Sequence, residues 1–237
     1  MLDLETGRGV AWLRLNRPEA LNALNRTLTA ALEEALERVT AMEDVNVLVV
    51  AGRGRAFCAG NDITEMATLG ADEAEALARR QAALMERFAR LPQVTLAAID
   101  GYALGGGLML AVAQDLRIAS DRARFGLPEG TLGFNPAYGI ARLHLLLTGR
   151  TIHASEALRM GLVNRVVAAP TLEATAEAWA ADIARAPRVG LAATKAVVAM
   201  LRAGGRGPEA EAYGAALRTS PAARELIQAF VSRKRRR

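Results

Sequence analysis

The sequence predicts an α/β protein whose strands pair in parallel. Short apolar runs alternate with longer segments in which apolar residues recur every three or four positions, and strands that alternate with helices are typical of parallel sheets. The run 45–50 is rich in valine and ends in small residues, as a buried strand does. The 237 residues suffice for one domain with a sizeable core.

In the first part of the chain each predicted strand is followed by a predicted helix. The strands are 10–16, 45–51, 94–100 and 116–119, and the helices are 27–42, 72–90, 106–113 and 136–147. In the first helix Leu28, Leu32, Leu36 and Val39 lie on one side.

The last third of the chain is predicted to be mainly helical. A short helix at 155–160 precedes a strand at 162–167, and helices follow at 172–185, 190–201, 209–217 and 222–230. Gly204, Gly205, Gly207 and Pro208 mark the clearest linker.

Composition is ordinary for a water-soluble protein, with 51% hydrophobic and 23% charged residues. No apolar run is long enough for a membrane span, and the N-terminus lacks a signal-peptide pattern, so no membrane partner is expected. The single cysteine excludes an internal disulfide and fits a reducing compartment, which predicts a cytoplasmic location.

The net charge of +5 lies in the last five residues, 233–237, which are all basic. Without them the chain has 30 − 5 = 25 basic residues against 25 acidic ones. A nucleic-acid-binding domain usually spreads a basic face over its fold, so nucleic acid is not the expected partner. The tail is either a solvated end or a contact for ligand phosphates.

Two glycine-containing turns, each after a predicted strand, are the candidate site. Gly105, Gly106 and Gly107 open a predicted helix, where unpaired N–H groups can stabilise negative charge on an oxygen. The loop 53–63 contains Gly60 and Asn61, which both tolerate unusual backbone angles. Each turn alone is also compatible with a packed turn, whereas the pair suggests an oxyanion hole with two N–H donors.

Seven sequence blocks resemble the crotonase superfamily, the enoyl-CoA hydratase/isomerase family of acyl-CoA enzymes. They are LNRPEALNAL at 15–24, RAFCAGNDITEM at 55–66, GYALGGG at 101–107, FGLPEGTLGF at 125–134, SEALRMGLVNRVV at 155–167, TKAVV at 194–198 and the closing AFVSRKR. The resemblance implies a spiral core of ββα turns at 1–186 and a helical C-terminal region at 187–237. That region would serve trimerisation and CoA contact, in a homotrimer or a dimer of trimers.

The resemblance also assigns the catalytic groups. The oxyanion donors are the backbone N–H groups of Asn61 and Gly106, and the acid–base group is Glu129. Family hydratases carry a second glutamate at the position of Met109, a thioether that cannot activate water as a carboxylate does.

This departure favours a proton shift over hydration, because a 1,3 shift needs only one base. The pattern is similar to that of the single-glutamate Δ3,Δ2-enoyl-CoA isomerases, and 3-enoyl-CoA to 2-enoyl-CoA isomerisation is the preferred interpretation. The alternatives are a hydratase or dehydratase with an unrecognised second acid, and an impaired scaffold that binds acyl-CoA or nucleic acid. Glu129 could also cap a helix or pair with Arg124.

Substrate contacts are likewise implied by the resemblance. They comprise Asn22, Ala23, Leu24, Ala59, Gly60, Asp62, Ile63, Gly105 and Met109, with Phe230, Arg233 and Lys234 in the tail. Arg17 or Arg26 is a candidate for a CoA phosphate, and the helix 74–88 for the border of the acyl pocket. No cofactor is expected, because coenzyme A is part of the substrate.

Other chemically capable residues are interpreted as secondary. Asp62 is expected to shape its turn, and Tyr138 could donate a hydrogen bond to substrate, whereas its neighbour Asn135 is no base. Cys58 would need a nearby base to act as a nucleophile, and His144 and His153 are read as structural. No spacing of ligands suggests a metal site, and no dinucleotide fingerprint or P-loop is present.

Overall fold

A computed structural model of the chain describes residues 1–129, 145, 148–202, 221, 224–225 and 227–228. Two sheets form its core: a six-stranded one in the order β1-β2-β3-β5-β7-β10 and a four-stranded one in the order β4-β6-β8-β9. The strands of the large sheet are β1 (Leu2–Gly7), β2 (Val10–Leu15), β3 (Val47–Gly52), β5 (Val94–Ile99), β7 (Leu116–Ser120) and β10 (Arg165–Val167). Those of the small sheet are β4 (Ala56–Cys58), β6 (Tyr102–Leu104), β8 (Arg124–Gly126) and β9 (Thr151–His153).

The chain passes back and forth between the two sheets in repeated strand–strand–helix turns. Each of β3, β5 and β7 in the large sheet is followed within a few residues by a short strand of the small sheet, β4, β6 or β8, and both sets pair in parallel. Among the strands that the structure describes, β1 and β9 pair antiparallel, with β2 and β8 respectively. This is the ββα spiral that the family resemblance implies, and the α/β class with parallel pairing is confirmed.

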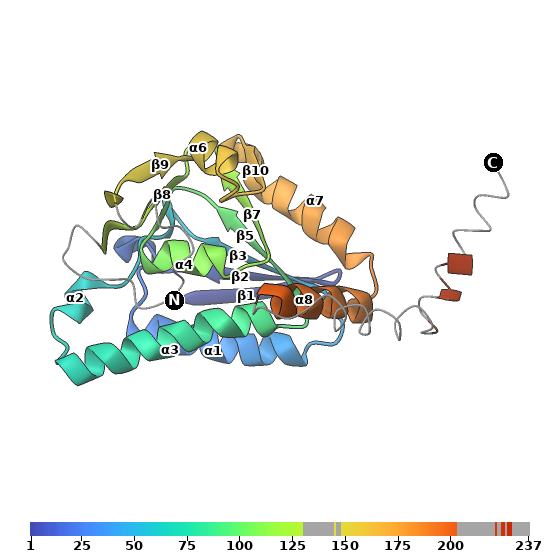
Figure 1. Cartoon of the computed structure of the whole chain (residues 1–237), viewed down its shortest axis with the longest axis horizontal. Coiled ribbons are helices and arrows are strands. Elements are labelled where there is room, and N and C mark those ends of the chain that lie inside the picture. The colour runs from blue at the N-terminus through green and yellow to red at the C-terminus, as the bar shows by residue number, and fades with distance from the viewer. Residues whose placement is uncertain (130–144, 146–147, 203–220, 222–223, 226, 229–237) are drawn as a thin grey trace.

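Helices cover both faces of the large sheet (Figure 1). The helices of the described residues are α1 (Arg26–Ala41), α2 (Ile63–Met66), α3 (Ala71–Arg90), α4 (Gly106–Val112), α6 (Ala154–Arg159), α7 (Leu172–Ala184) and α8 (Arg188–Arg202), with 3-10 turns at Pro18–Ala20 and Ala169–Thr171. Along β3, Val47 and Val49 pack in the cluster under α7, while Leu48 and Val50 pack in the cluster under α1, α3 and α4. Successive strand residues point to opposite faces, so a strand covered on both sides is apolar throughout.

The predicted helices and long strands lie within a few residues of the observed ones, as expected for element ends. The strand predicted at 162–167 is shorter in the structure, where it begins at Arg165. Five strands were not predicted: β1, β4, β6, β8 and β9. Four of these have three residues each, too few to show a periodic pattern.

The predicted helices 136–147, 209–217 and 222–230 fall wholly or largely outside the described residues. The predicted boundary at 186/187 lies between α7 and α8. That residues 187–237 form a region of their own stays a prediction. α8 is tied to the core by Lys195, whose amine donates to the carbonyls of Phe88 (3.0 Å) and Gln93 (2.9 Å) and pairs with Asp115 at 2.8 Å.

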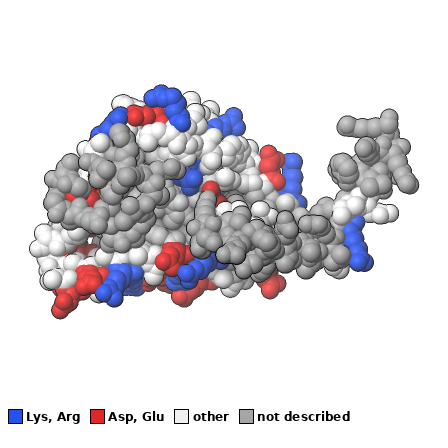
Figure 2. Space-filling view, in the orientation of Figure 1, with Lys and Arg blue, Asp and Glu red and all other residues white. Residues whose placement is uncertain are grey.

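Charged side chains on the outer helices neutralise one another. Along the lower edge in Figure 2 acidic and basic residues alternate. Between α3 and α1, Arg80 pairs with Glu33 and Arg87 pairs with Glu37. No helix among the described residues is long and apolar enough to span a membrane.

Candidate active site

The first turn of the site joins β4 to α2. Leu24 bridges to Asn61 as in a parallel ladder: its N–H donates to the Gly60 carbonyl (2.7 Å) and its carbonyl accepts from the Asp62 N–H (2.9 Å). In a parallel ladder the residues before and after Asn61 bond to the neighbouring segment, so the N–H of Asn61 itself points away from that segment. Gly60 has φ +106°, which a side chain would strain. The geometry therefore aims the Asn61 N–H away from residues 22–24.

The second turn joins β6 to α4. Gly105 has φ +50° and precedes the helix, whose first intrahelical bond runs from the Met109 N–H to the Gly105 carbonyl (3.1 Å). The N–H of Gly106 lies before that bond, among the helix donors that have no acceptor in their own helix.

The two turns are in contact. A Cβ on Gly60 would lie 3.0 Å from the Leu104 carbonyl oxygen and 3.6 Å from the Gly106 nitrogen. A Cβ on Gly107 would lie 2.0 Å from the Cys58 carbonyl oxygen, so α4 sits directly on β4. The turn that holds Asn61 and the turn that holds Gly106 are thus brought together by the fold, and glycine is required where the backbones meet.

Glu129 lies against the second turn. A Cβ on Gly105 would be 2.6 Å from its Oε1, and the residue is only 7% exposed. Its Oε2 is buried without a hydrogen-bond partner among the described residues. Burial raises the pKa of the Glu129 carboxyl, and a hydrogen bond from its own backbone N–H lowers it by less. A buried carboxyl with a raised pKa and a free oxygen is suited to proton transfer. Within the part of the chain that the structure describes, no ion pair joins Glu129 to Arg124, whose Nη1 donates to the carbonyls of Arg122 and Ala123.

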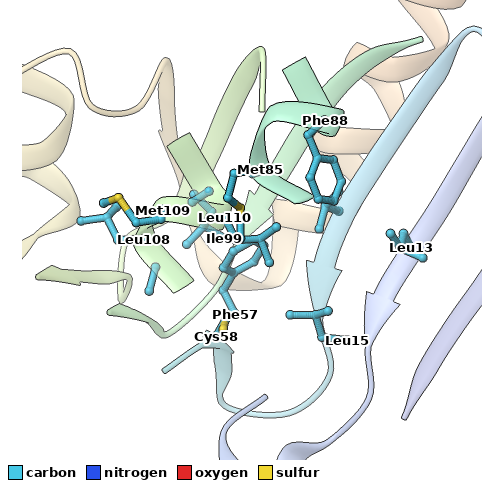
Figure 3. Close-up of a cluster of buried hydrophobic side chains, with 14 of the residues drawn as sticks. Leu13, Leu15, Phe57, Cys58, Met85, Phe88, Ile99, Leu108, Met109 and Leu110 are labelled. Carbon is cyan, nitrogen blue, oxygen red and sulfur yellow. The ribbon is translucent and has the colours of Figure 1, made fainter. Parts of the chain in front are cut away.

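Met109 belongs to the hydrophobic core. It is 2% exposed and packs in the cluster that includes Leu108, Leu110 and Phe57 (Figure 3). The position at which family hydratases carry a second glutamate thus holds a buried hydrophobic side chain in contact with other hydrophobic residues.

The structure corrects the assignment of Asn22 and Leu24 as direct substrate contacts. Asn22 is fully buried, with its Nδ2 donating to the carbonyls of Arg53 (2.9 Å) and Ala56 (2.8 Å). Leu24 is 1% exposed, and its backbone N–H and carbonyl bond to Gly60 and Asp62. Both residues support the loop from behind, and Ala23, also buried, lends its carbonyl to Arg17 (3.0 Å).

Neither arginine proposed for a CoA phosphate is free of acidic partners. Arg17 pairs with Asp62 at 2.7 Å, and Arg26 pairs with Glu65 at 3.0 Å and with Glu73 at 3.7 Å. Their charge is already compensated within the protein. Phe230, Arg233 and Lys234 lie outside the described residues, as do Asn135, Tyr138 and His144.

Asp62 shapes its turn as expected. Its Oδ1 accepts from the N–H groups of Thr64 (3.0 Å) and Glu65 (3.2 Å) and so caps α2. Ile63, the next residue, is 70% exposed and is the apolar residue of this loop that a ligand can reach. Ala59, which directly follows the buried strand β4, is partly exposed.

The remaining candidates have structural surroundings. Cys58 is fully buried, and burial raises the pKa of its thiol to about 12, so it is no nucleophile as it stands. His153 precedes α6 at the surface. Leu84, Met85 and Phe88 of α3 pack in the main core. The part of the chain that the structure describes holds no cluster of three metal-ligating side chains.

One hollow lies away from this site, between β1, β2 and α7, with a volume of about 390 Å³. Its central Arg14 pairs with Glu5 (3.0 Å) and Glu173 and stacks over Trp12 at 4.3 Å. None of the candidate catalytic residues lines this hollow.

Comparison with known proteins identifies the family. The sequence profile of the family described as enoyl-CoA hydratase/isomerase matches residues 5–234. The chain belongs to this family. It is 39% identical over 193 residues to a Mycobacterium bovis protein named "Probable enoyl-CoA hydratase echA8", covering 77% of this chain and 74% of that one. It is 38% identical over 206 residues to the (E)-benzylidenesuccinyl-CoA hydratase of Thauera aromatica, covering 82% and 80%.

Solved structures of the family share the fold. An enoyl-CoA hydratase from Bacillus anthracis superposes with a TM-score of 0.92 over 98% of this chain and 96% of the other, at 30% identity. The protein is therefore an acyl-CoA enzyme of the enoyl-CoA hydratase/isomerase family with the crotonase fold.

Proposed function

We propose that the enzyme converts 3-enoyl-CoA to 2-enoyl-CoA thioesters by a proton shift that uses one glutamate. The observation that carries the proposal is that Glu129, beside the paired turns, is the one buried carboxyl residue among those that the structure describes, while Met109 stands where family hydratases carry a second. Met109 packs against other hydrophobic side chains, and we assign to Glu129 alone the uptake and return of the proton.

The reaction is a transfer of one proton within the substrate. The thioester oxygen accepts hydrogen bonds from the N–H groups of Asn61 and Gly106, which stabilise the charge that develops on it. The ionised Glu129 removes a proton from C2, giving a dienolate, and returns it to C4 as the double bond moves into conjugation. No cofactor takes part, because coenzyme A arrives as part of the substrate.

Hydration of a 2-enoyl-CoA is the second candidate, supported by the names of the relatives. It would require a second group to hold and split the water that family hydratases bind between two carboxylates. A homotrimer or dimer of trimers, with the C-terminal region contacting CoA, completes the proposal by analogy with the family.

The deciding experiment incubates the purified enzyme separately with a 3-enoyl-CoA and a 2-enoyl-CoA and identifies products by mass and chromatography. We expect the 3-enoyl thioester to change its retention without a change in mass, and the 2-enoyl thioester to gain little water. Rapid addition of one water to the 2-enoyl thioester would overturn the isomerase assignment and favour a hydratase. Binding of both thioesters without turnover would point instead to a scaffold.

A further inference from the structure

An ion pair lies directly behind the proposed oxyanion hole. The Arg17 Nη1 lies 2.7 Å from the Asp62 Oδ2, and the two side chains are only 19% and 12% exposed. Asp62 is the residue after Asn61, so a shift of Asp62 moves the peptide that carries the proposed donor. The pair is therefore placed where it can act on the chemistry without touching the substrate.

Each partner of this pair is held by a different part of the chain. The Arg17 Nη1 also donates to the Ala23 carbonyl at 3.0 Å. The backbone N–H of Arg17 donates to the Asn22 Oδ1 at 2.8 Å. On the other side, the Asp62 Oδ1 caps α2 while its Oδ2 receives Arg17. One carboxylate thus connects the segment 17–24, the oxyanion turn and the start of α2.

The charges are balanced within this group. Burial raises the pKa of the Asp62 carboxyl, but the hydrogen bonds from Arg17, Glu65 and Thr64 outweigh it and leave the pKa below its ordinary value. Arg17 also has Glu19 at 3.9 Å, which is mostly exposed and reaches no part of the turn. Charge-assisted hydrogen bonds of a mostly buried pair are strong and directional, whereas the exposed Glu19 contact is weak.

We infer that the Arg17–Asp62 ion pair is a positioning device that fixes the direction of the Asn61 N–H toward the thioester oxygen. The inference rests on the proposed oxyanion hole, though not on whether the reaction is isomerisation or hydration. Small misplacements at a reacting centre cost about 10²-fold in rate, and loss of one oxyanion donor costs about 10²–10³-fold. The rate loss caused by a loosened turn should therefore be no larger than these values.

The test compares Asp62→Asn with wild type. Asparagine is as good a helix N-cap as aspartate, so the α2 cap is retained while the ion pair is lost. We expect kcat to fall by about 10–100-fold, as for a misplaced donor, with KM changed much less. In addition, the infrared carbonyl stretch of a bound 2-enoyl-CoA labelled with ¹³C at the thioester carbon should move back toward its frequency in water.

Three further variants separate positioning from general damage. Arg17→Gln breaks the same ion pair from the other side, and the Arg17→Gln/Asp62→Asn double variant should lose no more activity than either single one. Glu19→Gln removes the exposed partner of Arg17 and should leave kcat and the carbonyl band unchanged. Should Asp62→Asn not fold, Arg17→Gln carries the same comparison.

The outcomes distinguish this inference from the function on which it rests. A lowered carbonyl frequency in wild type that stays the same in Asp62→Asn and Arg17→Gln, with kcat within about twofold, would overturn the positioning role alone. Additive losses in the double variant would do so too. A wild-type enzyme that binds the thioester without lowering its carbonyl frequency would overturn the oxyanion hole itself.

Discussion

Two buried charged groups, Lys195 and Glu129, show how scaffold and site differ in this protein. Lys195 reaches from α8 into the core, where its amine has three acceptors within 3.0 Å. Glu129 is buried to a similar degree but keeps one carboxylate oxygen without a partner among the described residues. A buried charge costs free energy unless it is paired. The paired one therefore holds the fold together, and the unpaired one is available for chemistry.

The largest effect is expected from Glu129→Gln. The amide cannot take up a proton, so turnover of the preferred thioester should fall by about 10²–10⁴-fold, the usual contribution of a general acid–base group. Thermal stability should stay unchanged or rise, because an unpaired buried carboxylate is removed. Initial rates and thermal unfolding of the same preparation measure both.

The matched control is Glu34→Gln, at an exposed position of α1, which should change neither quantity. Retained turnover in Glu129→Gln would contradict the acid–base role. A large loss of stability would contradict the contrast with Lys195.

Lys195→Met should have the opposite profile. The variant removes the cationic partner of Asp115, whose carboxylate then keeps, among the described residues, only its hydrogen bonds from the Thr95 N–H (2.8 Å) and hydroxyl (3.1 Å). Breaking a buried ion pair from one side costs about 3–5 kcal/mol. Denaturant unfolding should show this loss, while kcat per folded molecule should remain near wild type.

The Lys195→Met/Asp115→Asn double variant provides the check, because removing both charges should recover part of the stability. If the double variant were no more stable than the single one, the ion pair would not be what ties α8 to the core.

Met109→Glu sharpens the comparison by adding a second buried carboxyl beside the first. We expect hydration of a 2-enoyl-CoA to appear or to rise, because two carboxylates can hold and split one water, at a stability cost of about 1–3 kcal/mol for the polar group in an apolar cluster. Met109→Gln carries an amide of the same shape and should pay the stability cost without gaining hydration. Equal hydration rates in both variants would show that position 109 does not set the reaction.

Much of the scaffold could be predicted from the sequence, because long segments carry their own pattern. The helix beginning at Arg26 shows apolar residues on one side, and β3 is apolar throughout since both its faces are covered. The strands β4, β6 and β8 could not be found in this way, because three residues show no period and their pairing is made between distant parts of the chain.

The site was predictable in its residue types but not in its contacts. The glycines and Glu129 carry a pattern that the family resemblance recognises, whereas the support from behind does not. No local signal indicates that Asn22 would be buried with its amide bonded to β4, or that Arg17 would meet Asp62 45 positions further along instead of a phosphate. Such contacts follow from the way the spiral brings residues 17–24 against the turn at 59–62.

The smallest effect expected is a difference in pH dependence between wild type and Glu129→Gln. Because the pKa of Glu129 is raised by burial, the folded protein holds this proton more firmly than the unfolded chain does. Stability from this group is therefore present at low pH and is lost as the pH rises from the ordinary glutamate value through the raised one. Catalysis should have the reverse dependence, since in the proposed reaction the ionised form removes the proton from C2, so kcat/KM should fall as the pH drops through the raised pKa.

Thermal unfolding and kcat/KM measured on one pH series test both signs, with Glu34→Gln following wild type throughout. The stability advantage of Glu129→Gln over wild type should be absent at acid pH, grow as the pH rises from the ordinary glutamate value, and be complete above the raised pKa. An advantage that is constant across the series would mean that Glu129 titrates alike in the folded and unfolded chains. The unpaired oxygen would then not reflect a carboxyl poised for proton transfer, and the contrast with Lys195 would be lost.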